Sequence, residues 1–125
     1  MVHTASAREI AELHARGGPT GSLPARIDRI SKALLGRPYG ADTLVGSPVR
    51  PEVLVTRVDR FDCVTYCETV FALAVAREPD AFERHLVALR YFQARVRWPA
   101  RNHYTVQWLR RNARAGYVRD VPGRG

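Results

Sequence analysis

The chain has 125 residues, a formal net charge of +8 and an apolar fraction of 46%. This length suits one small domain spanning residues 1–125, and the composition is that of a globular chain rather than a disordered one. No stretch approaches the ~18 apolar residues of a membrane-spanning helix, and no secretory signal opens the chain. As it stands, the sequence predicts a cytoplasmic protein without a membrane span.

The basic excess calls for an anionic partner, but the pattern of basic residues weakens that inference. Lys32 is the single lysine among 20 basic residues, a bias that indicates a GC-rich genome as readily as a function. The arginines are dispersed, with small clusters over residues 95–101 and 110–119, whereas nucleic-acid-binding domains concentrate them on a recognisable motif. The sequence therefore disfavours a nucleic-acid role and leaves an anionic glycan or peptide open.

Two helices are predicted in the first third of the chain. Ser6 and Glu9 form a capping box for a first helix, which should end at Gly17 and pack loosely over residues 1–21. Ser22 caps a second helix with Pro24 in its first turn. The apolar face of the second helix would consist of Ile27, Ile30, Leu34 and Leu23.

The middle of the chain predicts a loop, a short strand and a core helix. Residues 40–51 are rich in Gly and Pro and indicate a loop, and the β-branched content of residues 52–60 favours a strand. Asp62 is the expected N-cap of the next helix, with Cys63 as its first residue. Residues 64–76 are almost continuously apolar, which is typical of a helix buried in a core.

The last third predicts two more helices around an irregular segment. Asp80 is expected to cap a helix over residues 82–91, and residues 92–104 should be irregular. Thr105 begins a last helix that Gly116 closes, and residues 119–125 look like a frayed tail.

Two cysteines supply the candidate reactive groups. Cys63 and Cys67 lie four residues apart, which is not a usual disulfide arrangement, and no further ligands complete a zinc site, so we expect free thiols and neither a metal nor a cofactor. Cys67 lies deeper in the apolar helix, and we expect it to be a small buried hydrophobic residue. Cys63 lies in the first helical turn, where unpaired N–H groups favour a thiolate, so it is the candidate nucleophile. An ordinary buried thiol is the alternative.

A nucleophilic thiol needs a base, and the sequence offers four histidines. His3 is close to the chain end, and His14 and His85 fall on helices rich in Arg and Glu, where surface positions are expected. His103 lies in a polar cluster with Arg101 and Tyr104, a combination that suits recognition of a carboxylate or an amide. His103 is thus the candidate base, and a capping or packing histidine is the alternative.

Several of these segments resemble a known family. The segment from Arg60 to Val70 and the Ala72-Leu73-Ala74 run that follows resemble the nucleophile segment of a bacterial N-acetylmuramoyl-L-alanine-amidase-like family, in the NlpC-type branch of papain-like peptidoglycan hydrolases. Residues 101–104 resemble the family's Arg-x-His-Tyr block. Residues 34–39 resemble the Leu-Gly-x-Pro-Tyr element of NlpC-type domains.

The resemblance implies an α+β fold in which helices pack on a small antiparallel sheet. It implies thiol-dependent hydrolysis of an amide bond in peptidoglycan or a related peptide, with Cys63 as nucleophile. Arg101, Tyr104 and Tyr39 would bind substrate, and His103 would be a further site residue.

One departure from the family pattern qualifies this expectation. The family's general base is a histidine on a later His-x-Gly strand, which this sequence does not contain. We therefore expect the helix-rich N-terminal part of the fold, with few strands, truncated before the main sheet and inactive or incomplete. A second chain or self-association would then cover the apolar helix.

Two other classes of function stay open. A non-enzymatic binding module would hold an anionic peptide, glycan or nucleic acid through Arg101, His103, Tyr104 and the basic surface. A helical interaction protein would use the apolar helix as an oligomer contact.

Overall fold

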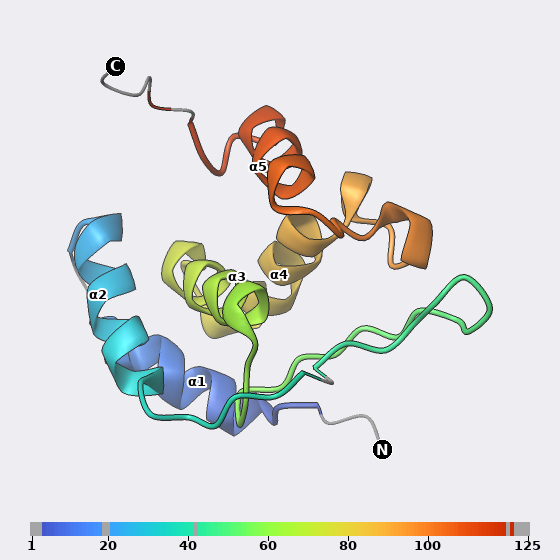
Figure 1. Ribbon diagram of the computed structural model, residues 1–125. Helices are drawn as coiled ribbons and strands as arrows, with labels where there is room; N and C mark the ends of the chain where they lie inside the picture. The colour runs from blue at the N-terminus through green and yellow to red at the C-terminus, as the bar shows by residue number, and fades with distance from the viewer. Residues whose placement is uncertain (1–3, 19–20, 42, 120, 122–125) are drawn as a thin grey trace.

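The computed structural model describes residues 4–18, 21–41, 43–119 and 121. Within these residues the regular structure is helical, with five α-helices and three short 3-10 turns joined by extended segments (Figure 1). The α-helices are α1 (Ala7–Arg16), α2 (Leu23–Leu34), α3 (Cys63–Val75), α4 (Phe82–Arg90) and α5 (Thr105–Arg114). The 3-10 turns are η1 (Pro79–Ala81), η2 (Phe92–Ala94) and η3 (Trp98–Ala100).

Helix α3 is the centre of the packing. It contacts α1, α2 and α4, and in Figure 1 it lies between the α1–α2 pair and α4. Ala72 and Leu73 are fully buried, and Ile30 of α2 and Leu89 of α4 are equally inaccessible. The apolar sequence of α3 thus forms the core, as its composition predicts.

The two N-terminal helices begin where the sequence predicts, and α1 also ends at the predicted residue. Ser6 accepts a hydrogen bond from the Glu9 backbone and Glu9 bonds back to the Ser6 backbone, which completes the capping box of α1. Gly17 is the C-cap of α1, and Ser22 caps α2 with Pro24 in the first turn. On α2, Ile30 and Leu34 are buried, whereas Leu23 is 39% exposed.

The predicted strand over residues 52–60 does not form. This segment is extended, but its pairing consists of isolated bridges, Val45 with Val53 and Thr4 with Thr56. A different segment supplies each partner, so no continuous ladder develops. The burial also fails to alternate, because Val55 and Thr56 are both buried.

Asp80 does not cap α4, which corrects the sequence prediction. Pro79 starts the 3-10 turn η1 and Asp80 lies inside that turn, so Ala81 becomes the N-cap of α4 without a side-chain hydrogen bond. The face predicted for α4 is buried, with Phe82, Leu86 and Leu89 at 2% exposure or less.

Polar anchors hold helix α5. Trp108 packs against the core, but Val106 and Leu109 are 59% and 48% exposed. Asn112 is the buried residue of this helix, and its side-chain amide donates to the carbonyl oxygen of Leu89 at 3.0 Å. The Trp108 indole donates to Glu68 of α3, so directed hydrogen bonds to α3 and α4 fix α5 more than apolar burial does.

One side of α3 is open to solvent. Cys63, Val64 and Cys67 are all exposed. The buried position predicted for Cys67 is therefore wrong, because Cys67 lies one helical turn from Cys63 on the same uncovered side. Each helix in the described part of the chain is too short or too polar to cross a membrane.

Candidate active site

The first turn of α3 is held by a reciprocal cap. The Thr65 backbone N–H donates to Oδ1 of Asp62 at 2.8 Å, and the Asp62 backbone N–H donates to Oγ1 of Thr65 at 3.0 Å. The hydroxyl of Thr43 donates to the other Asp62 oxygen at 3.2 Å. The long loop before α3 therefore contributes to fixing the residue that precedes Cys63.

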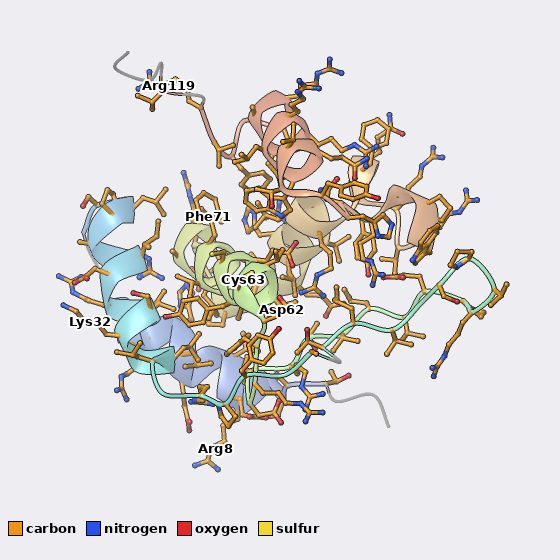
Figure 2. All side chains as sticks on the ribbon, in the orientation of Figure 1. Arg8, Lys32, Asp62, Cys63, Phe71 and Arg119 are labelled. Atoms are coloured by element: carbon orange, nitrogen blue, oxygen red, sulfur yellow. The ribbon has the colours of Figure 1, made fainter. Side chains whose placement is uncertain are left out.

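Cys63 is exposed at the beginning of α3, next to its N-cap (Figure 2). Within the described structure, the backbone N–H groups of Cys63 and Val64 are in no hydrogen bond. The next two N–H groups, of Thr65 and Tyr66, are both taken by Asp62. The helix start thus presents two unused donors beside an accessible thiol, which is a favourable place for negative charge.

Cys67 differs from Cys63 in its electrostatic surroundings. Partial desolvation raises the pKa of the Cys67 thiol, and the neighbouring Cys63 and Glu68 raise it further. A raised pKa keeps Cys67 protonated at neutral pH, so it is the poorer nucleophile by charge state.

Tyr39 is brought close to this helix start by the backbone. It forms an isolated parallel bridge with Phe61, two residues before Cys63. The Gly40 N–H donates to the Phe61 carbonyl at 3.0 Å, and the ring of Tyr39 is 76% exposed. The structure therefore brings two of the predicted site residues, Tyr39 and Cys63, into one neighbourhood.

Arg101 is engaged inside the protein. Its guanidinium donates to Oε2 of Glu52 at 3.2 Å, and the Tyr91 hydroxyl donates to the same oxygen at 2.6 Å. The side chains of Arg101 and Glu52 are only 12% and 1% exposed. Burial and the hydrogen bond to Glu52 raise the pKa of Tyr91. Arg101 thus joins Glu52 to the end of η3, and Tyr91 joins Glu52 to the end of α4.

His103 is exposed but already has a partner. Its Nε2 lies 2.7 Å from the Trp98 carbonyl oxygen, so this nitrogen carries the proton, and its ring lies against the Trp98 ring with centroids 4.5 Å apart. No contact between His103 and Cys63 occurs among the described interactions. Tyr104, beside it, is 74% exposed.

The other histidines depart from the surface role predicted for them. His14 Nε2 lies 2.7 Å from the carbonyl oxygen of Ala76, and His85 Nδ1 lies 2.7 Å from the Tyr117 hydroxyl. Both contacts join segments distant in sequence, so these histidines tie helices to later parts of the chain. His3 lies outside the described residues.

Sequence reasoning missed a buried polar network behind the site. Glu68 and Arg90 are 1% and 3% exposed, and the Arg90 Nε donates to Glu68 Oε1 at 3.0 Å. The Trp108 indole donates to the second Glu68 oxygen at 3.0 Å, and Arg90 also donates to the Val55 carbonyl at 2.7 Å. Burial raises the pKa of Glu68, against the opposing effect of Arg90. The Glu68 carboxylate interrupts the otherwise apolar sequence of α3, and this was the sequence feature that could have indicated a buried polar network.

The described histidines, cysteines and carboxylates form no group of three that could hold a metal ion. The chemistry available at the start of α3 is therefore that of a thiol, two backbone donors and a nearby tyrosine.

A family model described as AmiA-like, N-acetylmuramoyl-L-alanine amidase-like, matches residues 29–124. No curated protein matches the chain. Among solved structures, a protein from Legionella pneumophila is similar at 32% identity with a TM-score of 0.76, covering 88% of this chain and 38% of its own.

Two Bacteroides structures are also similar. An N-acetylmuramoyl-L-alanine amidase from Bacteroides uniformis matches at 29% identity with a TM-score of 0.62, covering 68% of this chain and 38% of that one. A putative xylanase from Bacteroides fragilis matches at 27% identity and 0.64, covering 72% and 41%. The chain thus spans 38–41% of the length of these structures.

Proposed function

Because the chain belongs to the N-acetylmuramoyl-L-alanine amidase-like family, we propose that Cys63 is the nucleophile of a cysteine amidase or peptidase domain that acts on peptidoglycan-type amide bonds. The observation that carries the proposal is the exposed thiol at the capped start of α3. We further propose that the chain is the cysteine-bearing part of an NlpC-type, papain-like fold.

The proposed reaction is acyl transfer through a thioester. The Cys63 thiolate attacks the amide carbonyl carbon, and the carbonyl π electrons move onto oxygen to form an oxyanion. The N–H groups of Cys63 and Val64, which have no partner among the described residues, would donate to it. The Thr65 N–H is excluded from this role because it is bonded to Asp62. Collapse breaks the C–N bond, the amine leaves with a proton, and water then releases the acid and restores the thiol.

The proton transfers require a base, and each of the described histidines already has a ring nitrogen engaged in a hydrogen bond. His14 and His85 are hydrogen-bonded away from the thiol. His103 has Nε2 occupied by the Trp98 carbonyl, which leaves only Nδ1 to accept a proton. We therefore propose that His103 is at most an auxiliary group and that these residues by themselves hydrolyse substrate slowly or not at all.

Substrate contacts are proposed for the exposed aromatic hydroxyls. Tyr39 adjoins the segment that leads into Cys63, and Tyr104 presents an exposed ring. The sequence suggests that Arg101 binds substrate. Because its guanidinium is paired with Glu52, we propose instead that Arg101 holds the segment that contains Glu52.

Thiol selectivity tests the nucleophile directly. In single-thiol variants, Cys63→Ser and Cys67→Ser, we expect iodoacetamide at neutral pH to label Cys63 about tenfold faster than Cys67, because the Cys67 pKa is raised. Mass spectrometry of the time course measures both rates. Equal rates at neutral pH would refute an activated Cys63.

Hydrolysis of muropeptides tests the enzymatic claim. We expect slow release of product that Cys63→Ala abolishes and that Cys67→Ala leaves unchanged, read by chromatography of the products. Rapid turnover lost in His103→Ala would contradict the proposal that the base is not among these residues.

A binding module remains the second candidate, and the basic C-terminal third favours it. Two of its predicted contacts, Arg101 and His103, already bond within the chain. A binding module would be distinguished from an enzyme by binding to an anionic ligand that is retained in Cys63→Ala and that weakens steeply as the salt concentration rises.

A further inference from the structure

The net charge of the chain is concentrated in one stretch. Nine arginines lie between Arg84 and Arg119, and this stretch contains no aspartate or glutamate. The other eleven basic residues are offset by twelve acidic ones, so the whole excess of +8 arises within residues 84–119. Such segregation produces a local positive potential that an even distribution would cancel.

Most of these arginines face solvent. Arg90 and Arg101 are the exceptions, because they form ion pairs with Glu68 and Glu52. The exposed members are Arg84, Arg95, Arg97, Arg110, Arg114 and Arg119. In Figure 1, α5, η2 and η3 together form one side of the molecule, away from α1. Five of the exposed arginines lie on or beside these elements, so this side is basic: Arg95, Arg97, Arg110, Arg114 and Arg119.

A groove on the outer face of α5 is lined by basic, polar and aromatic side chains. Arg110 and Arg114 lie one helical turn apart and line it together with Tyr104 and Gln107. In the part of the chain that the structure describes, neither the Arg110 nor the Arg114 side chain takes part in a hydrogen bond or ion pair. Like charges at this spacing repel each other, and a bound anion relieves that repulsion.

Contacts of Arg111 with two neighbouring side chains fix part of the groove lining. The guanidinium of Arg111 lies over the Phe92 ring at 4.5 Å and donates to the Asn102 side chain at 3.1 Å. The Gln107 carbonyl oxygen accepts from the His103 backbone at 3.1 Å, which turns its amide N–H₂ toward other acceptors. A fixed aromatic floor, a free amide and two unpaired guanidinium groups are thus presented side by side.

From this charge complementarity we infer that the α5 groove binds an acidic peptide carrying at least two carboxylates. Arg110 and Arg114 would hold the carboxylates through charge-assisted bonds, Gln107 would donate to a peptide carbonyl, and Phe92 with Tyr104 would contact aliphatic atoms. The inference rests on the proposed function only for the source of the peptide, which would be the acidic stem of a peptidoglycan substrate.

The mixed lining favours a peptide over other anions. A bare phosphate polymer has no aliphatic atoms to contact Phe92 and Tyr104. A membrane surface requires an apolar face to insert, and α5 exposes just two large apolar residues, Val106 and Leu109. Phosphate-bearing ligands are therefore the competing outcomes of the test.

Fluorescence anisotropy with a labelled oligoglutamate peptide tests the inference, using the Cys63→Ser protein so that no turnover intervenes. We expect binding at low salt, with oligoglutamine not bound. The double variant R110Q/R114Q should weaken oligoglutamate binding about tenfold. The matched control R16Q/R77Q removes the same charge from exposed arginines outside the 84–119 stretch and should weaken it less than about twofold.

Three outcomes overturn the inference. Equal weakening in the two double variants would mean that only net charge matters, and no binding of oligoglutamate would remove the site. Tighter binding to single-stranded DNA, polyphosphate or phosphatidylglycerol vesicles would reassign the groove to phosphate. If Arg110 and Arg114 prove necessary for oligoglutamate binding while muropeptides are never cleaved, the groove stands and the proposed activity fails.

Discussion

Single side chains in this molecule gain their roles from what they bond. Asp62, the N-cap that the sequence predicts, accepts hydrogen bonds from the Thr65 backbone and the Thr43 hydroxyl and so positions the start of α3. His103 is exposed, yet its Nε2 is committed to the Trp98 carbonyl. The availability of a group for chemistry therefore depends on its hydrogen-bond partners as well as on its exposure.

His85 gives a pH prediction at this scale. Partial burial, reinforced by the charge of Arg84, lowers the pKa of His85 from its ordinary value of 6.5. The unfolded chain then binds a proton first, so stability should decline as the pH falls through 6.5 toward the lower folded pKa. Thermal melts between neutral and mildly acidic pH measure this, and His85→Gln should flatten the profile. An unchanged profile in that variant would assign the slope to other groups.

The elements are joined by polar contacts as well as by apolar ones. Helices α1 and α2 pack their apolar sides against α3, and Ile30 of α2 is fully buried. The Glu68–Arg90–Trp108 network instead connects α3, α4 and α5 through hydrogen bonds, and Arg90 extends it to the Val55 carbonyl. Because α5 buries little apolar surface, its position depends on this network.

Removing one member of the network should be costly. Glu68→Ala leaves the Arg90 charge buried without a partner, so we expect a loss of about 3–5 kcal/mol in the free energy of unfolding, measured by urea denaturation. The matched control is Glu12→Ala, which breaks the exposed Arg8–Glu12 pair and should cost less than about 1 kcal/mol. A similar small loss in both variants would show that the Glu68–Arg90 pair is not needed for stability.

The whole molecule has a dense centre and a lightly packed C-terminal side. Leu73 and Leu89 are fully buried at the α3–α4 contact, whereas Asn112 is the buried residue of α5. The same C-terminal side carries the whole net positive charge. Packing density and charge are therefore segregated along the chain.

Hydrogen exchange should report this gradient. Opening α5 exposes less apolar surface than opening α3, so the amides of α5 should exchange faster than those around Leu73. Exchange followed by mass spectrometry measures the order. Protection of α5 equal to that of α3 would mean that the molecule opens as one cooperative unit.

The sequence by itself determined the helices and the position of the candidate nucleophile. The Ser6–Glu9 box and the Asp62 cap were predictable because a cap is a hydrogen bond between residues three apart. The apolar run of α3 likewise predicted its central place. The family resemblance rested on contiguous segments, and the match over residues 29–124 confirms it at the level of an amidase-like family.

Only the tertiary structure decided which side chains are available. Residues 52–60 have strand-like composition, but a ladder needs a continuous partner strand, which the described segments do not supply. Cys67 has an apolar sequence context and is still exposed, because among the described residues no neighbouring element covers its side of α3. Arg101 and Glu68 gained partners distant in sequence, Glu52 and Arg90. Burial and ion pairing depend on segments far apart in the chain, and local sequence patterns carry no information about which segments meet.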